Sequence, residues 1–204
     1  MRILLLADSH GIGMDMMLMS KIDQCIVKSI QVSQRTSMIK RKYESKLGEV
    51  YRFRPDVILV HTGHNDFMYH PVHNRHPTHL KYYFTELETF CRQLRGNHPR
   101  ANFILSSAFP RTTGPLMGDV KKGQYNRLAV RYGAMVRSYA KQENIGYVLN
   151  SMLWLSVRQL QERADLFRTD GLHLTSTGQE LVASGWANAI LLSLGYNVPV
   201  TQLI

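Results

Sequence analysis

The stretch Leu4-Leu5-Leu6-Ala7-Asp8-Ser9-His10-Gly11-Ile12-Gly13 decides the fold that we expect for this chain. Its first four residues belong to a strand predicted over residues 2–7, whose apolar run is continuous rather than alternating, as in parallel strands buried on both faces. The run stops at a serine, and two glycines precede the next helical pattern. The stretch therefore predicts a strand that delivers the Ser9 hydroxyl to a turn, although Asp and Ser before a helix more often cap it.

Apolar patterns further along the chain predict the rest of the sheet. Short runs typical of strands occur at residues 26–32, 56–61, 102–107 and 146–149. Helical spacing predicts helices over residues 14–24, 39–50, 80–94, 124–142 and 176–194, with 151–167 helical in part. This alternation indicates an α/β fold, a three-layer α/β/α sandwich with a five-stranded parallel sheet in the flavodoxin-like order 2-1-3-4-5. Sites in such sheets form at the carboxyl ends of the strands, which would gather Ser9, Ser33 and Asn65.

The composition indicates a single globular domain over residues 1–204, with 44% hydrophobic and 20% charged residues. No apolar run approaches the roughly 20 residues of a membrane helix, and the opening run is too short for a signal peptide. Cys25 and Cys91 have neither metal-binding nor redox spacing. We therefore expect an intracellular, cytoplasmic protein without a transmembrane segment.

The net charge of +10 comes from two segments. Residues 35–54 hold seven basic and two acidic residues, and residues 111–141 hold seven basic and one acidic residue. In the expected topology the helices of these segments flank the helix at 80–94 on one face of the sheet. This basic face predicts weak, salt-dependent binding to nucleic acid or to an anionic membrane surface, although charged helix faces are usually only solvated.

Two further motifs carry chemistry. In Asp170-Gly171-Leu172-His173, the carboxylate stands three residues before the histidine, so it could hold one ring nitrogen while the other takes a proton from Ser9. Gly63-His64-Asn65-Asp66 directly follows the strand expected at 56–61. Its glycine and asparagine suit any loop, but the Asn65 amide could also donate a hydrogen bond to a developing oxyanion.

In this order, the motifs of Ser9, Asn65 and His173 resemble those of the SGNH, or GDSL-like, hydrolase family along nearly the whole chain. The resemblance implies Ser9 as nucleophile, with Asp170 and His173 completing a catalytic triad. It also implies an oxyanion hole formed by the Asn65 side chain and the Ser9 backbone N–H, supported by Gly63 and His64.

The sequence departs from the family pattern in two places. The first glycine of the family's Gly-Asp-Ser block is Ala7 here, and residues 26–38 lack the glycine that normally supplies an oxyanion donor. Ser33 or Gln34 stands nearest to that missing donor. A basic, signal-free domain of this kind is also similar to the esterase domain in the first open reading frame of L2/CR1-type non-LTR retrotransposons.

The leading prediction is a serine esterase that hydrolyses short acyl esters, acetyl esters first, on a small-molecule or lipid substrate, with no cofactor and no metal. The alternative is a weakly active or inactive SGNH-fold module of a retrotransposon protein that binds nucleic acid or anionic lipid through its basic face. A metal enzyme is a third hypothesis, based on histidines 61, 64, 70, 73, 76 and 79. Most of them fall on a stretch that we expect to be an irregular loop, with no tight pair at helical spacing and only Asp66 as a nearby carboxylate, so we expect His64 to line the pocket instead.

Overall fold

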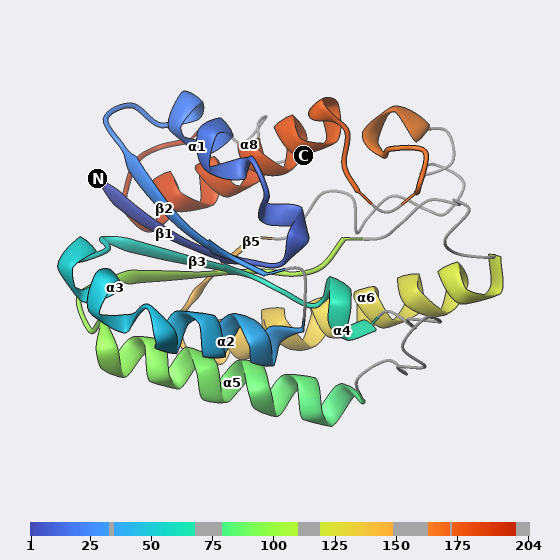
Figure 1. The fold of residues 1–204 in the computed structure, drawn as a ribbon, viewed down its shortest axis with the longest axis horizontal. Coiled ribbons are helices and arrows are strands. Elements are labelled where there is room, and N and C mark those ends of the chain that lie inside the picture. Colours follow the sequence, from blue (N-terminus) through green and yellow to red (C-terminus); the bar gives the residue numbers. More distant parts are fainter. Residues whose placement is uncertain (33–34, 68–78, 110–118, 149–162, 172, 199–204) are drawn as a thin grey trace.

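A computed structural model describes residues 1–32, 35–67, 79–109, 119–148, 163–171 and 173–198 (Figure 1). The strands are β1 (Arg2–Ala7), β2 (Ile26–Gln31), β3 (Val57–His61), β4 (Asn102–Ser106) and β5 (Gly146–Val148). They pair in parallel in the order β2-β1-β3-β4-β5, with β5 as a three-residue strand at the edge. The predicted α/β fold, with a parallel sheet and covering helices, is confirmed.

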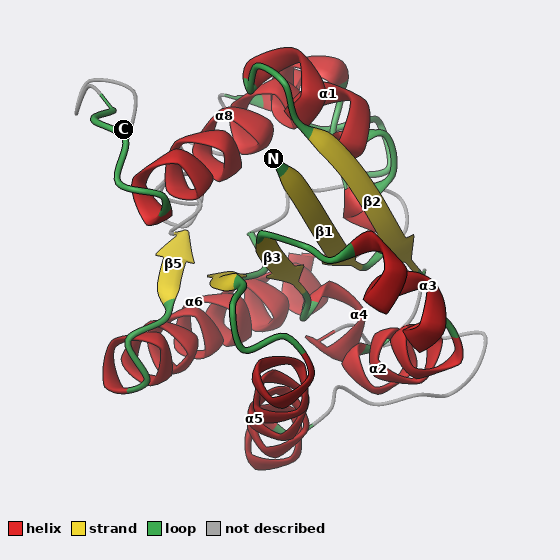
Figure 2. Ribbon diagram, turned by 90° about the vertical axis from the view of Figure 1, so that its left-hand side faces the viewer, coloured by secondary structure: helices red, strands yellow, loops and turns green. Residues whose placement is uncertain are grey.

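Helices cover both faces of the sheet, as Figure 2 shows from its end. One layer contains α1 (Met14–Lys21) and α8 (Ser176–Ser193), which pack against each other. The other layer contains α2 (Thr36–Ser45), α3 (Leu47–Phe53), α5 (Leu80–Asn97) and α6 (Asp119–Gln142). Each layer buries its own apolar cluster against the sheet, because the side chains of a buried strand alternate between its two faces.

The register of the sheet places three strand ends beside one another. Ala7 at the end of β1 pairs with His61 of β3, and His61 pairs with Ser106 of β4. The loops that leave these strands therefore start at one edge of the sheet, where the sequence predicted the site.

Several elements differ from the prediction. The helix expected over residues 39–50 is two helices, α2 and α3, because Lys46 leaves helical geometry at φ −111° and ψ 13°. One turn of helix, α4 (His64–Phe67), follows β3 where a loop was expected. Residues 33, 34 and most of 151–167 lie outside the described residues. No helix in the described ranges has the length and apolarity needed to cross a membrane.

Candidate active site

The turn after β1 presents Ser9 at the carboxyl edge of the sheet. Asp8 caps one turn of 3₁₀ helix, η1 (Ser9–Gly11), by accepting a hydrogen bond from the His10 backbone N–H at 3.1 Å. Gly11 is needed here, because a Cβ at this position would lie 2.4 Å from the Cβ of Ala7. Gly13, at φ 79°, then turns the chain into α1. The strand, turn and helix predicted from the opening stretch are thus present, and Ser9 is half-buried between them.

Asp170 and His173 form the hydrogen-bonded pair that the sequence predicted. The carboxylate lies 2.7 Å from His173 Nδ1 and accepts a second hydrogen bond from the His173 backbone N–H at 2.9 Å. A β-bridge between Phe167 and Leu174 closes this loop just before α8. Because the carboxylate holds Nδ1, the ring is fixed in the orientation that leaves Nε2 free to exchange a proton.

The Asp170–His173 pair lies beside the turn that carries Ser9. The imidazole of His173 stacks on that of His10, the residue after Ser9, with ring centroids 5.5 Å apart. The packing of α1 against α8 brings these two segments together. Among the described residues, no hydrogen bond joins Ser9 to His173, so the structure shows the His–Asp pair but not the complete triad.

Asn65 supplies an unused hydrogen-bond donor. It lies in α4 directly after Gly63, whose φ of 117° suits glycine and whose missing Cβ leaves room for the Phe67 ring. Within the described residues, Asn65 Nδ2 is one of three buried side-chain polar atoms without a hydrogen-bond partner. Buried donors are rarely left unsatisfied, so an unpaired amide at this edge is suited to a substrate oxygen.

His64 is buried and held in place by its neighbours rather than exposed to a pocket. Its Nε2 accepts the Phe109 backbone N–H at 3.4 Å, and its Nδ1 lies 2.7 Å from the Tyr125 hydroxyl. The hydroxyl in turn donates to the Phe109 carbonyl at 3.2 Å. Because a backbone N–H can only donate, these contacts assign the ring proton to Nδ1.

Asp66 connects α4 to the start of α2. Its carboxylate accepts hydrogen bonds from the Thr36 backbone N–H at 3.0 Å and the Thr36 hydroxyl at 2.8 Å. Burial raises the pKa of Asp66, and the bonds from Thr36 oppose that effect. Thr36 follows Ser33 and Gln34, so Asp66 anchors the end of the segment in which a third oxyanion donor was expected. Ser33 itself is outside the described residues and stays a prediction.

Sequence reasoning missed the buried polar residues behind Ser9. Asp8 was interpreted only as a helix cap, yet it also accepts hydrogen bonds from His10 Nδ1 at 3.2 Å and from the His64 backbone N–H at 3.3 Å. Burial opposes ionisation of Asp8, but the hydrogen bonds from His10 and the nearby histidines overcome it and lower the pKa of the carboxyl. The sequence did contain a signal for these contacts, which is the carboxylate of Asp8 at the end of an apolar strand. A buried charge needs polar partners, so other polar groups had to lie nearby.

A model of the GDSL-like lipase/acylhydrolase family matches residues 23–181, a range that includes Asn65 and His173 and begins after Ser9. A search of curated proteins found no match to this sequence. A GDSL-like lipase from Bacteroides thetaiotaomicron is similar in structure, with a TM-score of 0.73, 16% identity, and coverage of 94% of this chain and 88% of that one.

Two acetylxylan esterases are also similar in structure. For one, the TM-score is 0.69 and the identity 18%, covering 93% of this chain and 100% of that one. A catalytic mutant of the other, from Geobacillus stearothermophilus, has a TM-score of 0.65 and 16% identity, covering 96% of this chain and 94% of that one. At these identities the likeness establishes the fold alone.

Proposed function

The chain belongs to the GDSL-like lipase/acylhydrolase family, and on that premise we propose that it is a serine esterase that hydrolyses short acyl esters, acetyl esters first. The observation that carries the proposal is the Asp170–His173 pair, which lies against the turn that carries Ser9. A histidine oriented by a carboxylate next to a serine hydroxyl is the arrangement that activates a serine nucleophile.

In the proposed reaction, Ser9 Oγ attacks the ester carbonyl while His173 Nε2 takes the hydroxyl proton. The tetrahedral oxyanion accepts hydrogen bonds from Asn65 Nδ2 and the Ser9 backbone N–H. The intermediate collapses when His173 returns the proton to the leaving alcohol, which departs and leaves an acyl ester on Ser9. Water activated by His173 then releases the acid by the same two steps. Asp170 stabilises the imidazolium in each half-reaction.

One comparison supports a short acyl group. Solved structures with the same fold include acetylxylan esterases, so the fold is suited to removing acetyl groups. We take acetyl esters of small alcohols or sugars as the first substrates to test.

The Ser9→Ala variant tests this function with p-nitrophenyl acetate. We expect hydrolysis to fall to the background rate while the far-UV circular dichroism stays unchanged, because the lost hydroxyl is only half-buried. Ser20→Ala is the matched control, since Ser20 is an exposed serine on α1 whose hydroxyl bonds only its own helix. Wild-type turnover in Ser9→Ala would contradict the assignment.

A second candidate function is a weakly active or inactive binding module whose basic face holds nucleic acid or anionic lipid, as in a retrotransposon protein. The observation that favours it is the shared layer of α2, α5 and α6. Exposed basic side chains on α2 and α6 are Arg41, Lys42, Arg127, Arg131, Arg137 and Lys141. Fluorescence anisotropy with single-stranded RNA should show an affinity that falls steeply as salt rises from about 50 to 200 mM. The slope of log affinity against log salt should be roughly proportional to the number of phosphates contacted. Binding that ignores salt would contradict this candidate.

A further inference from the structure

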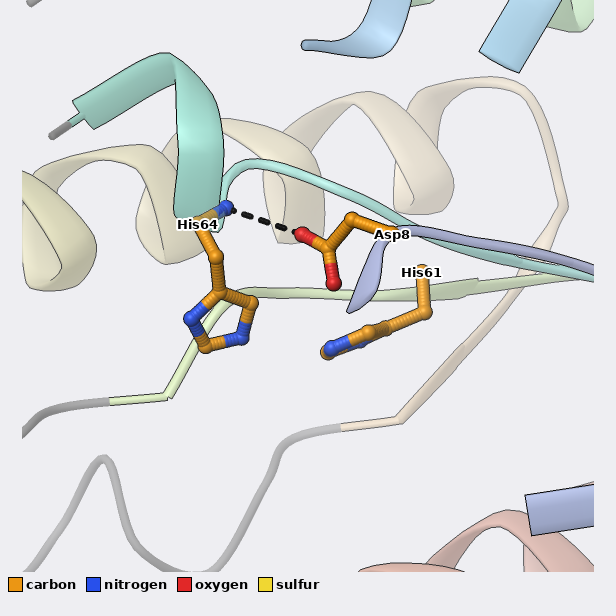
Figure 3. A group of neighbouring side chains, drawn as sticks. All are labelled: Asp8, His61 and His64. Carbon is orange, nitrogen blue, oxygen red and sulfur yellow. Dashed lines mark hydrogen bonds between the residues drawn. The ribbon is translucent and has the colours of Figure 1, made fainter. Parts of the chain in front are cut away.

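Three buried ligand-type side chains converge directly behind the candidate active site. Asp8 follows β1, His61 ends β3 and His64 begins α4, with exposed fractions of 1%, 0% and 0%. One potential ligand atom of each lies within 4.8 Å of those of the other two. Figure 3 shows the Asp8 carboxylate between the two imidazole rings. The sheet register causes this meeting, because Ala7 and His61 are paired neighbours.

Both imidazoles are held through their Nδ1 atoms. His64 Nδ1 lies 2.7 Å from the Tyr125 hydroxyl, and His61 Nδ1 lies 2.9 Å from Ser106 Oγ. Ser106 Oγ also accepts the Trp186 indole N–H at 2.9 Å, which fixes its position. Histidines that bind a metal typically hydrogen-bond through the ring nitrogen that is not coordinated, and this fixes both tautomer and ring orientation.

The two Nε2 atoms are the ring nitrogens that would bind the ion. His61 Nε2 is fully buried and has no hydrogen-bond partner, which is uncommon for a ring nitrogen in a protein interior. His64 Nε2 accepts the long 3.4 Å hydrogen bond from the Phe109 N–H described above, which a bound ion would replace. The unpaired nitrogen of His61 is an observation independent of the clustering, and it too indicates a missing partner.

The donor types of the cluster suit a cation. Among the described residues, no lysine or arginine pairs with the Asp8 carboxylate. One carboxylate and two imidazoles form a donor set typical of zinc and related divalent transition metals.

We propose that Asp8, His61 and His64 bind one divalent transition-metal ion, zinc first. Zinc with nitrogen and oxygen ligands at roughly 2.0–2.2 Å places donor atoms of a tetrahedral site about 3.4 Å apart, so donor atoms that lie within 4.8 Å of one another would have to approach by at most about 1.4 Å. Three protein ligands leave the fourth position to a water molecule.

The ion would hold two segments of the candidate active site in place and would take no part in the reaction itself. Asp8 precedes Ser9 and His64 precedes Asn65, so one ion bound to both would join the nucleophile's turn to the oxyanion donor's helix. This role is independent of the proposed esterase activity, and its test does not require turnover.

The first experiment measures metal binding by the whole chain. The protein is stripped with EDTA, dialysed into metal-free buffer and titrated with ZnCl₂ while heat and melting temperature are recorded. We expect one zinc per chain and a rise in Tm, because a ligand that binds only the native state stabilises it. Wild-type protein that binds no zinc would overturn the proposal.

Variants identify the site. His61→Gln should abolish the stoichiometric zinc, whereas His98→Gln should keep it, because His98 is a buried histidine that contacts Tyr43 away from the cluster. A triple variant with glutamine at positions 70, 73 and 76 should also keep it, which separates this site from the other histidines that follow β3. Zinc retained by His61→Gln, or lost only in the triple variant, would overturn the proposal.

A spectroscopic measurement on the wild-type chain does not depend on how the variants fold. Cobalt(II) added to the stripped protein should give the intense visible d–d absorption of a four-coordinate ion, and one equivalent of zinc should displace it. Only the weak spectrum of hydrated cobalt would count against the site.

Discussion

The imidazole ring of His10 stacks on that of His173, with centroids 5.5 Å apart and an angle of 22° between the planes. Both histidines belong to Asp–His pairs in which one carboxylate bonds the ring Nδ1 and the backbone N–H of the same residue. His10 also stacks on the buried His64 at 3.8 Å. The proposed catalytic base therefore lies against a ring that is itself held by the protein interior.

His10→Ala should lower kcat for p-nitrophenyl acetate by about tenfold to a hundredfold, with little change in KM, because His173 loses the ring that positions it. His10→Phe keeps a planar ring and should recover most of that loss. Steady-state kinetics of the wild type and both variants under the same conditions give the kcat and KM values to compare. Equal losses in both variants would show that the ring's hydrogen bond to Asp8, and not its stacking, is what matters.

Asp170→Asn should lower kcat by roughly a thousandfold or more, because an amide at this position favours the wrong imidazole tautomer. Asp165→Asn is the matched control, since Asp165 is an exposed aspartate nearby that pairs with Arg163. The same ester assay applies to both. An active Asp170→Asn enzyme would remove Asp170 from the proposed triad.

Asn65→Ala should lower kcat by about 100- to 1,000-fold, the usual effect of losing one oxyanion donor. Its folding stability should change little, because Nδ2 has no partner to lose within the described residues. Urea unfolding measures the second half of this prediction. Asn102→Ala serves as the control, because that amide bonds the Ser193 carbonyl far from the site. A large loss of stability in Asn65→Ala would mean that the amide has a structural role instead.

Thr36→Val should destabilise the protein by about 1–3 kcal/mol, because it removes a hydroxyl that bonds a buried carboxyl. Thr36→Ser keeps the hydroxyl and should restore most of the stability. If Asp66 and Thr36 also position the segment that carries Ser33, the valine variant will lose kcat beyond its loss of folded protein. Chemical unfolding and activity on the same samples separate the two effects.

His98 should make stability depend on pH. Burial lowers the pKa of His98 below the ordinary value of 6.5, so the native state binds fewer protons than the unfolded state. Its contribution to stability is therefore present above pH 6.5 and lost as the pH falls through the folded pKa. The free energy of unfolding of His98→Asn should fall less steeply between pH 7.5 and 5 than that of the wild type. An identical slope would contradict the assigned shift.

Strong local patterns made most of the fold predictable. The apolar pattern of residues 2–7 fits only a buried strand, and that of residues 80–94 fits only an amphipathic helix. Both elements are present where the sequence predicted them. The Asp170–His173 pair was predictable because three residues of separation let the carboxylate reach the ring. Asn65 was located by its place after a buried strand.

The parts that sequence reasoning missed depend on tertiary contacts. The α4 turn forms because Gly63 at positive φ lets the chain reverse over Phe67, which no local periodicity encodes. The contacts that bring Asp8 to His61 and His64 join residues more than 50 positions apart and depend on the pairing of β1 with β3. No pattern in single segments could reveal them.

The 2.4 Å that would separate a Cβ at Gly11 from that of Ala7 means that positions 7 and 11 share room for one methyl group. In this chain Ala7 takes that room, at the position where the family's block begins with glycine. The two positions should therefore exchange in concert among relatives, with a glycine at the first permitting an alanine at the second. Such paired variation would mark the close approach of the two backbone segments even in relatives whose Gly-Asp-Ser block has changed.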